Sequence, residues 1–140
     1  MSVIERLLRR DAPGEATSVG EVEISPLRRR DLRRGVMDIE AVSYPRPWSQ
    51  GVFESEISQV RSGTRHYLVA RSAPDGRRTR IVGYAGVWFS GDEAHVTNVA
   101  VMPASRRRGV ATALMLGLAD AAIGRSCRSW TLEVRVSSTG

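Results

Sequence analysis

Apolar residues recur along this 140-residue chain in two periods, and each period predicts a different kind of secondary structure. Alternation of apolar and polar residues predicts a β-strand over 21–26, and segments rich in residues that favour strands predict others over 67–71, 80–89, 93–101 and 129–136. Helical spacing predicts α-helices over 31–43, 50–60 and 109–123. The pattern therefore predicts one domain of mixed α/β structure over 21–140, preceded by a loose leader over 1–20.

The first and third predicted helices each have an apolar face. In the first helix, Gly35 weakens the helix, and the face consists of Leu32, Val36, Ile39 and Val42. The third helix has a face of small residues that permits close packing on a sheet, and Gly124 is expected to end it. That face consists of Val110, Ala113, Leu114, Gly117, Leu118 and Ala121.

The start of the second helix has its own signals. Pro45 and Pro47 hold the preceding segment extended, and Ser49 is a favourable N-cap. Trp48 and Phe53 occupy the two positions of a hydrophobic staple across that cap. Trp48 is therefore interpreted first as a packing residue, although a wall of a substrate groove is compatible with the same position.

The connections predict how the strands pair. A Pro-Asp-Gly turn at 74–76 makes strands 67–71 and 80–89 an antiparallel hairpin, which the next strand extends to a meander. The strands at 93–101 and 129–136 flank a single helix, so they form a β-α-β crossover and are expected to be parallel.

Composition narrows the function classes. The net charge is +6, but all 21 basic residues are arginines scattered over turns and helix faces, so no nucleic-acid partner is expected. No stretch reaches the roughly 18 apolar residues of a membrane span, and no metal site is expected. Cys127 is interpreted as a small filler near a helix end, and His95 as an exposed or half-buried strand residue.

One stretch, 96–114, joins a predicted strand to a predicted helix through a basic turn, V-T-N-V-A-V-M-P-A-S-R-R-R-G-V-A-T-A-L. A helix that begins near Gly109 exposes about four backbone N–H groups beside the strand end. Gly109 lets an anion approach the backbone, and Arg106, Arg107 and Arg108 can close over it. The stretch predicts a diphosphate site, whereas R-x-x-G-x-A alone fits an ordinary basic helix start.

These motifs resemble those of the GCN5-related N-acetyltransferase (GNAT) family. The order N-V-A-V-x-P-x-x-R-R-x-G-V-A-x-x-L at 98–114 is followed by L-E-V-R at 132–135. The segments P-W-S-x-x-x-F at 47–53 and D-E-A-x-x-x-N-V-A-V at 92–101 are similar to the RimI-like subgroup, which acetylates the N-terminal alanine of a ribosomal protein. The resemblance implies an α+β fold with a mixed, mostly antiparallel sheet and a V-shaped β-α-β site for acetyl-coenzyme A.

The resemblance also implies residues that bind acetyl-coenzyme A. Backbone groups of Val99, Ala100 and Val101 would hold the pantetheine arm and the acetyl group. Ser138 stands where an asparagine of the family contacts the cofactor, so this contact is expected to be weak. The diphosphate would lie against Arg106, Arg107, Arg108, Gly109, Val110, Ala111 and Thr112.

The same resemblance implies how the reaction proceeds. Glu133 would act as the general base that takes a proton from the acceptor amine, which then attacks the thioester directly. Tyr44 and Trp48 would belong to the loop that meets the acceptor, with Asn98 and Glu93 as second choices for site residues. The predicted function is therefore acetylation of a protein N-terminus, such as that of a ribosomal protein, in the cytoplasm.

The sequence departs from the family after L-E-V-R. The family continues with a helix, a tyrosine that protonates the leaving thiolate and two more strands, and these are not found before Gly140. We expect a C-terminally truncated chain with low turnover and an exposed strand edge through which it can dimerise. The alternative function is a catalytically impaired module that derives from such an enzyme and binds coenzyme A or a partner.

Overall fold

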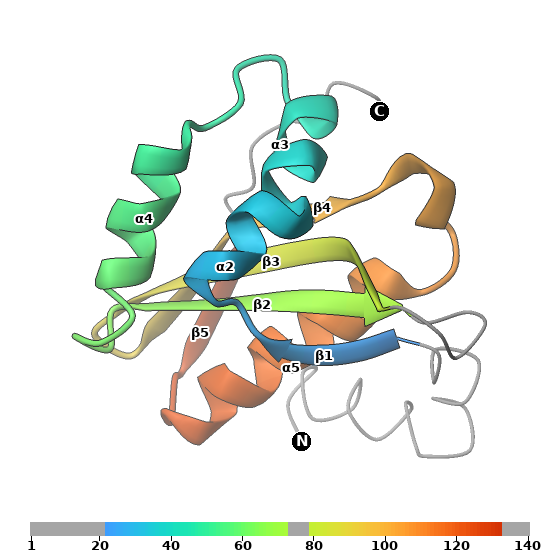
Figure 1. Ribbon diagram of the computed structural model, residues 1–140. Helices are drawn as coiled ribbons and strands as arrows, with labels where there is room; N and C mark the ends of the chain where they lie inside the picture. The colour runs from blue at the N-terminus through green and yellow to red at the C-terminus, as the bar shows by residue number, and fades with distance from the viewer. Residues whose placement is uncertain (1–21, 73–78, 133–140) are drawn as a thin grey trace.

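A five-stranded sheet forms the centre of the protein, as a computed structural model describes it for residues 22–72 and 79–132 (Figure 1). Its order is β1-β2-β3-β4-β5, with the first four strands antiparallel and β5 parallel to β4. The strands are β1 (Val22–Pro26), β2 (Arg65–Ser72), β3 (Arg80–Ser90), β4 (Glu93–Val101) and β5 (Ser129–Leu132). The structure confirms the predicted mixed sheet, the antiparallel pairing of β2 with β3, the meander and the β-α-β crossover, whereas the Pro-Asp-Gly turn at 74–76 lies outside the described residues.

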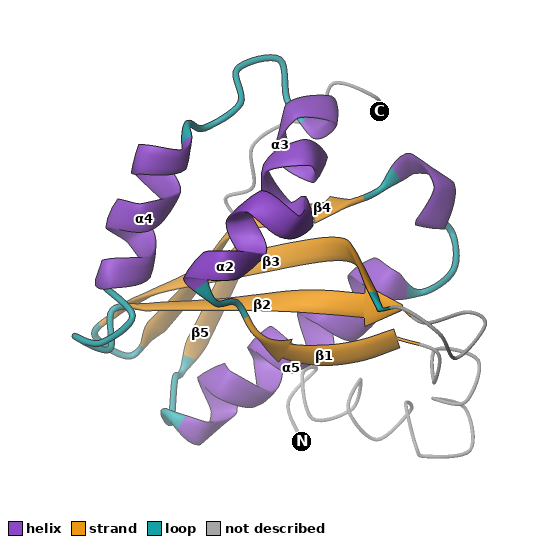
Figure 2. Cartoon of the chain, in the orientation of Figure 1, coloured by secondary structure: helices purple, strands orange, loops and turns teal. Residues whose placement is uncertain are grey.

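Helices cover both faces of this sheet (Figure 2). One face carries α2 (Arg29–Asp31), α3 (Met37–Ser43) and α4 (Gln50–Ser58), and the opposite face carries α5 (Val110–Gly124). Each face buries its own apolar core, with Leu114 and Leu118 of α5 in one and Ile39 and Phe53 in the other. The sheet is therefore buried on both sides, and β4 has one core on each face.

The prediction of one continuous helix over 31–43 is wrong. A π-helical turn, Leu32–Val36, separates α2 from α3. At Gly35 the chain approaches β3 so closely that an added Cβ would lie 2.8 Å from Cβ of Ile81, which explains the glycine. Val42, predicted to belong to the apolar face, is 47% exposed, whereas Ile39 on the same face is fully buried.

The start of α4 is built as the sequence predicts. Ser49 Oγ accepts a hydrogen bond from the backbone N–H of Val52 at 3.3 Å. The rings of Trp48 and Phe53 pack edge to face, with centroids 5.2 Å apart, so the hydrophobic staple is present. The helix ends at Ser58, two residues before the predicted end, and the chain then forms a series of turns.

The helix α5 begins where the sequence predicts, with Gly109 as its N-cap. Its end differs from the prediction, because Gly124 is the last helical residue and the left-handed residue is Ser126, at φ 59°. The helix is also rotated slightly from the predicted face, since Ala113, Gly117 and Ala121 are only half-buried. Its buried residues are Val110, Leu114, Leu118, Ala119 and Ala122.

A β-bulge interrupts β4 in its middle. Gly86 of β3 pairs with Asn98 and Val87 pairs with Val96, so Thr97 is an extra residue without a partner on β3. On both sides of the bulge the same face of β4 meets the α5 core, through Ala94, Val96, Val99 and Val101. Ala100 packs in the other core, and by alternation Asn98 shares its face, toward α3 and α4.

Candidate active site

Among the described residues, one edge of the C-terminal half of β4 has no neighbouring strand. The backbone N–H of Met102 donates to a carbonyl of β3 at 2.8 Å, so Val99 and Val101 direct their backbone groups the opposite way. On that edge the Tyr44 hydroxyl donates to the Val99 carbonyl and Arg106 Nε donates to the Val101 carbonyl, both at 3.1 Å. Within the described residues β5 pairs only as far as Val96, which leaves the N–H groups of Val99 and Val101 unpaired by β5.

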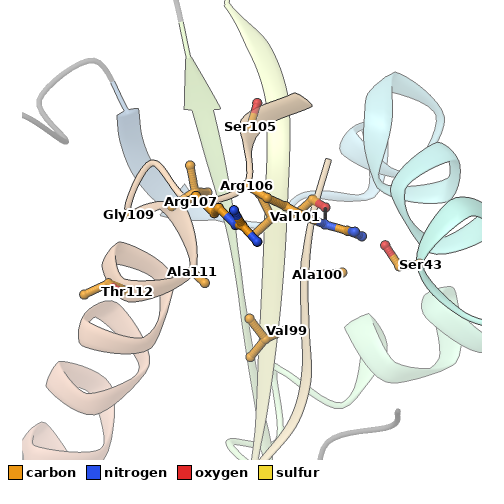
Figure 3. Close-up of a pocket in the computed structure, with 11 residues that line it drawn as sticks. Ser43, Val99, Ala100, Val101, Ser105, Arg106, Arg107, Gly109, Ala111 and Thr112 are labelled. Carbon is orange, nitrogen blue, oxygen red and sulfur yellow. Dashed lines mark hydrogen bonds between the residues drawn. The ribbon is translucent and has the colours of Figure 1, made fainter. Parts of the chain in front are cut away.

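A pocket of about 400 Å³ lies at this edge (Figure 3). It brings together most of the residues that the sequence predicted for the cofactor, and adds Ser43 and Ser105. Its lining is Ser43, Val99, Ala100, Val101, Ser105, Arg106, Arg107, Gly109, Val110, Ala111 and Thr112. Arg108 is exposed and does not line it, and Ser138 lies outside the described residues.

The turn before α5 is shaped to present N–H groups. Arg107 and Gly109 both adopt left-handed backbone conformations, with φ of 63° and 82°. Turns that mix left-handed and right-handed residues direct successive N–H groups into one concavity, which suits an anion. Gly109 also has no side chain to cap the helix, so its side chain satisfies none of the first N–H groups of α5. A long residue with positive φ, such as Arg107, is strained and marks a functional candidate.

The opposite wall of the pocket is fixed by a buried carboxylate. Glu40 is fully buried in α3, where one oxygen accepts from the Trp48 backbone N–H at 2.7 Å and the other accepts from the Tyr84 hydroxyl. These bonds tie the loop between α3 and α4 to the sheet. Tyr44 and Trp48, predicted to meet the acceptor, turn their side chains into the core and do not line the pocket.

The sequence reasoning missed Glu40 and Ser43. The two partners of Glu40 lie 8 and 44 residues away along the chain, so no local pattern indicates their contact. Ser43 ends a helix and carries no motif, yet it lies across the pocket from β4. Only the packing of α3 against the sheet brings either residue to the site.

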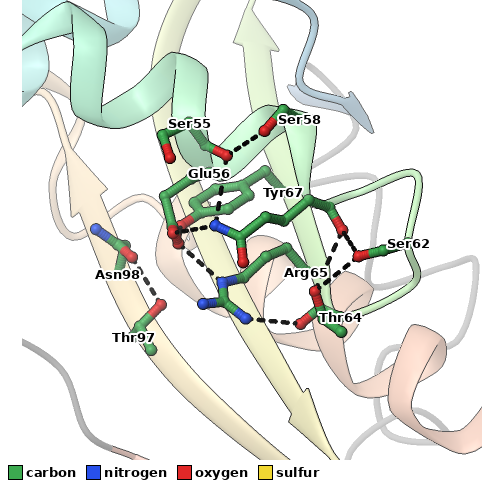
Figure 4. Close-up of polar contacts among 10 residues, drawn as sticks. Ser55, Glu56, Ser58, Ser62, Thr64, Arg65, Tyr67, Thr97 and Asn98 are labelled. Atoms are coloured by element: carbon green, nitrogen blue, oxygen red, sulfur yellow. Dashed lines mark hydrogen bonds and ion pairs between the residues drawn. The ribbon is translucent and has the colours of Figure 1, made fainter.

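A polar cluster lies beneath α4 on the same face of the sheet (Figure 4). Glu56 Oε1 accepts hydrogen bonds from Arg65 Nε at 3.0 Å and from the Tyr67 hydroxyl at 2.8 Å. Burial, together with the hydrogen bond to Glu56, raises the pKa of Tyr67 far above its ordinary value. Tyr67 is therefore a fixed hydrogen-bond donor. Beside it, Thr97 Oγ1 donates to Asn98 Oδ1 at 2.7 Å.

His95 and the second-choice site residue Glu93 lie together at the start of β4. The prediction that His95 is exposed or half-buried is wrong, because it is 8% exposed. Its Nδ1 lies 2.6 Å from Thr131 Oγ1 of β5, and its ring lies 5.0 Å from that of Trp88. Glu93, a second-choice site residue, lies at the start of β4 with its carboxylate 3.3 Å from His95 Nε2. Both residues lie at the β5-paired end of β4, outside the pocket.

The remaining candidates concern the chain end and Cys127. Glu133, the predicted general base, lies outside the described residues and directly follows Leu132, which pairs with Val96. Cys127 is half-buried, and burial raises its pKa, which fits a filler rather than a nucleophile. Among residues 22–72 and 79–132, no cluster of three or more metal-ligating side chains occurs. No helix in these same ranges is long and apolar enough to span a membrane.

The site combines three features: a strand with an open edge, a turn rich in N–H groups and a helix N-terminus. The chain belongs to the acetyltransferase (GNAT) family, whose model matches residues 33–140. It is 33% identical over 103 residues to a Bacillus subtilis protein described as a putative ribosomal protein bS18-alanine N-acetyltransferase. That match covers 74% of this chain and 64% of the relative.

Solved structures agree with this assignment. The ribosomal-protein-S18-alanine N-acetyltransferase of Escherichia coli superposes with a TM-score of 0.63 at 26% identity, over 79% of this chain and 65% of that one. The PaiA N-acetyltransferase of Thermoplasma acidophilum, solved in complex with coenzyme A, shares the fold with a TM-score of 0.59 at 17% identity, over 76% and 74%. The chain thus spans less than two thirds of the Bacillus and Escherichia proteins.

Proposed function

We propose that this protein transfers the acetyl group of acetyl-coenzyme A to the α-amine of a protein N-terminus. The observation that carries the proposal is one pocket that joins the open edge of β4, the left-handed turn and the N-terminus of α5. An anionic diphosphate is favoured at such a turn because N–H groups and the helix dipole both point at it. Arg107, on the pocket wall, adds a charged donor.

The thioester belongs along the open edge of β4. The N–H groups of Val99 and Val101 face that edge, while their carbonyls already accept from Tyr44 and Arg106. One of these N–H groups can polarise the thioester carbonyl, as an oxyanion hole does. Ala100 directs its backbone toward β3 and contributes to the pocket wall instead. In this proposal only Val99 and Val101 make backbone contacts to the cofactor, whereas the sequence motif implied Ala100 as well.

The chemical step needs a neutral amine. In our proposal, Glu133 takes a proton from the acceptor amine, directly or through a water molecule. The neutral amine then attacks the thioester carbonyl, its nitrogen releases a second proton to solvent, the carbon–sulfur bond breaks, and the thiolate takes a proton from solvent. This direct transfer forms no covalent intermediate on the protein.

The proposed acceptor is a protein that begins with alanine, such as a ribosomal protein. The support is the 33% identity to the Bacillus protein, together with the P-W-S segment, which builds the cap and staple of α4. A ribosomal acceptor places the reaction in the cytoplasm. The acceptor would enter on the side of the α3–α4 loop, which carries Tyr44 and Trp48.

Two measurements test the function. Calorimetric titration with coenzyme A should show saturable binding, and its absence would overturn the proposal. Turnover of acetyl-coenzyme A with an alanine-initiated peptide should then be detectable, whereas binding without turnover would favour the impaired module. Glu133→Gln should lower kcat by about a hundredfold or more and leave coenzyme A affinity unchanged. Glu93→Gln, which removes an exposed acid at the other end of β4, should leave kcat unchanged.

A further inference from the structure

Two buried polar atoms have no hydrogen-bond partner in the described part of the chain, Ser43 Oγ and Asn98 Nδ2. Ser43 is 1% exposed and Asn98 is 0% exposed. A buried donor or acceptor without a partner costs about 1–3 kcal/mol, and such groups are rare in folded proteins. Two of them beside one strand therefore need an explanation, and a missing ligand supplies one.

Both atoms lie on the α3 and α4 side of β4. Ser43 ends α3 and lines the pocket, and Figure 3 shows it across from Ala100. Asn98 does not itself line the pocket; it shares the face of Ala100, which does, and stands two residues earlier in β4, about 7 Å along the strand. Its Oδ1 is held by Thr97, so its amino group is the end left for a partner (Figure 4).

The protein holds both groups in place before any ligand binds. Glu40 anchors the C-terminal end of α3 through its bonds to Trp48 and Tyr84, and Tyr44, next to Ser43, bonds to the β4 carbonyl of Val99. The diphosphate end of the pocket is the α5 side, so Ser43 lies at its far wall. That wall is where an acceptor would meet the thioester.

We infer that Ser43 and Asn98 bind the backbone of the acceptor's N-terminal residue; this inference rests on the proposed function. An amino group such as Asn98 Nδ2 can only donate, so its partner is a carbonyl oxygen, namely that of the first residue. The Ser43 hydroxyl can accept, so it receives an N–H of the neutral α-amine and leaves the nitrogen lone pair free to attack. Both residues are positioning residues for the amine.

The test measures binding of an alanine-initiated peptide to the full chain saturated with coenzyme A. Ser43→Ala and Asn98→Leu should each weaken peptide binding by about tenfold, the effect of one hydrogen bond. Coenzyme A affinity should stay within twofold of the unsubstituted chain. Ser43→Thr, which keeps the hydroxyl, should bind peptide better than Ser43→Ala. Ser62→Ala, which removes an exposed serine hydroxyl bonded to Gln59, is the matched control and should change neither affinity.

Thermal unfolding separates this role from a structural one. Removal of an unpartnered polar atom from a buried position should leave the melting temperature of Ser43→Ala unchanged or raise it. Unchanged peptide affinity in both variants, or an equal loss of peptide and coenzyme A affinity, overturns the inference. So does a chain that binds coenzyme A but no peptide. A chain that binds no coenzyme A contradicts the proposed function instead, before any variant is compared.

Discussion

The two faces of β4 carry different kinds of polar groups near the pocket. On the α5 face the groups are backbone N–H groups at the turn around Gly109, set among small apolar side chains. On the α3 and α4 face the groups are buried side chains: Ser43 lines the pocket, whereas Glu40 and Asn98 are buried without lining it. The first face depends on local backbone conformation, and the second depends on contacts between segments far apart in the sequence.

This difference suggests a division of tasks. Backbone N–H groups recognise any diphosphate of the right size, so the α5 face suits a cofactor shared by a whole family. Side chains can be exchanged one at a time, so the α3 and α4 face suits the part of the ligand that differs among relatives.

Glu40→Ala tests whether the α3 and α4 face depends on its buried carboxylate. The substitution leaves the Tyr84 hydroxyl and the Trp48 N–H without their acceptor, so we expect a loss of about 3–5 kcal/mol in the free energy of unfolding. Urea denaturation measures it. Glu54→Ala, which removes a surface ion pair with Arg29, should cause no measurable change. Equal losses in both variants would contradict the anchoring role of Glu40.

Gly109→Ala tests the backbone face. At φ 82° a Cβ costs about 1–2 kcal/mol of stability, and the added methyl group also obstructs an anion at the turn. Denaturation and coenzyme A titration should therefore both show a loss. Gly124→Ala is the matched control, because it ends the same helix and its added Cβ meets no atom within 4 Å. It should be neutral or stabilise the protein by up to about 1 kcal/mol.

Arg107→Ala tests whether a side chain assists the backbone on the same face. Arg107 lines the pocket, so its loss should weaken coenzyme A binding by about tenfold, with a weaker dependence on salt. Arg108→Ala removes the same charge one residue later, outside the pocket, and should weaken binding less than twofold. Similar losses would mean that general positive charge, rather than the pocket, attracts the cofactor.

The smallest expected effect is a change in how the stability of the protein depends on pH, and it comes from His66. Burial, together with the charge of Arg125, lowers the pKa of His66 in the folded protein. The unfolded chain therefore binds more protons once the pH falls below about 6.5, so this contribution to stability is present above that pH and is lost below it. His66→Gln should flatten the dependence of the melting temperature on pH between about 7 and 5. An unchanged slope would contradict this assignment.

Local signals predicted most of the fold and one face of the site. The Ser49 cap, the staple of Trp48 and Phe53, and the Gly109 turn involve residues within a few positions of each other, so the sequence shows them. The kink at Gly35 depends on the approach of Ile81 from β3, which no local pattern shows. Glu40 and Asn98 gain their importance only from the packing of helices on the sheet.

The bulge at Thr97 has a consequence for the spacing of hydrogen-bonding groups. In a regular strand, neighbouring side chains point to opposite faces, and those on one face stand about 7 Å apart. The extra residue brings the Thr97 hydroxyl to the adjacent Asn98 amide, at 2.7 Å. The hydroxyl holds the amide oxygen, so the buried amide nitrogen has a fixed orientation. Side chains on a β-strand normally act singly. Here the inserted residue lets Thr97 and Asn98 act as a pair, with one oriented hydrogen-bond donor.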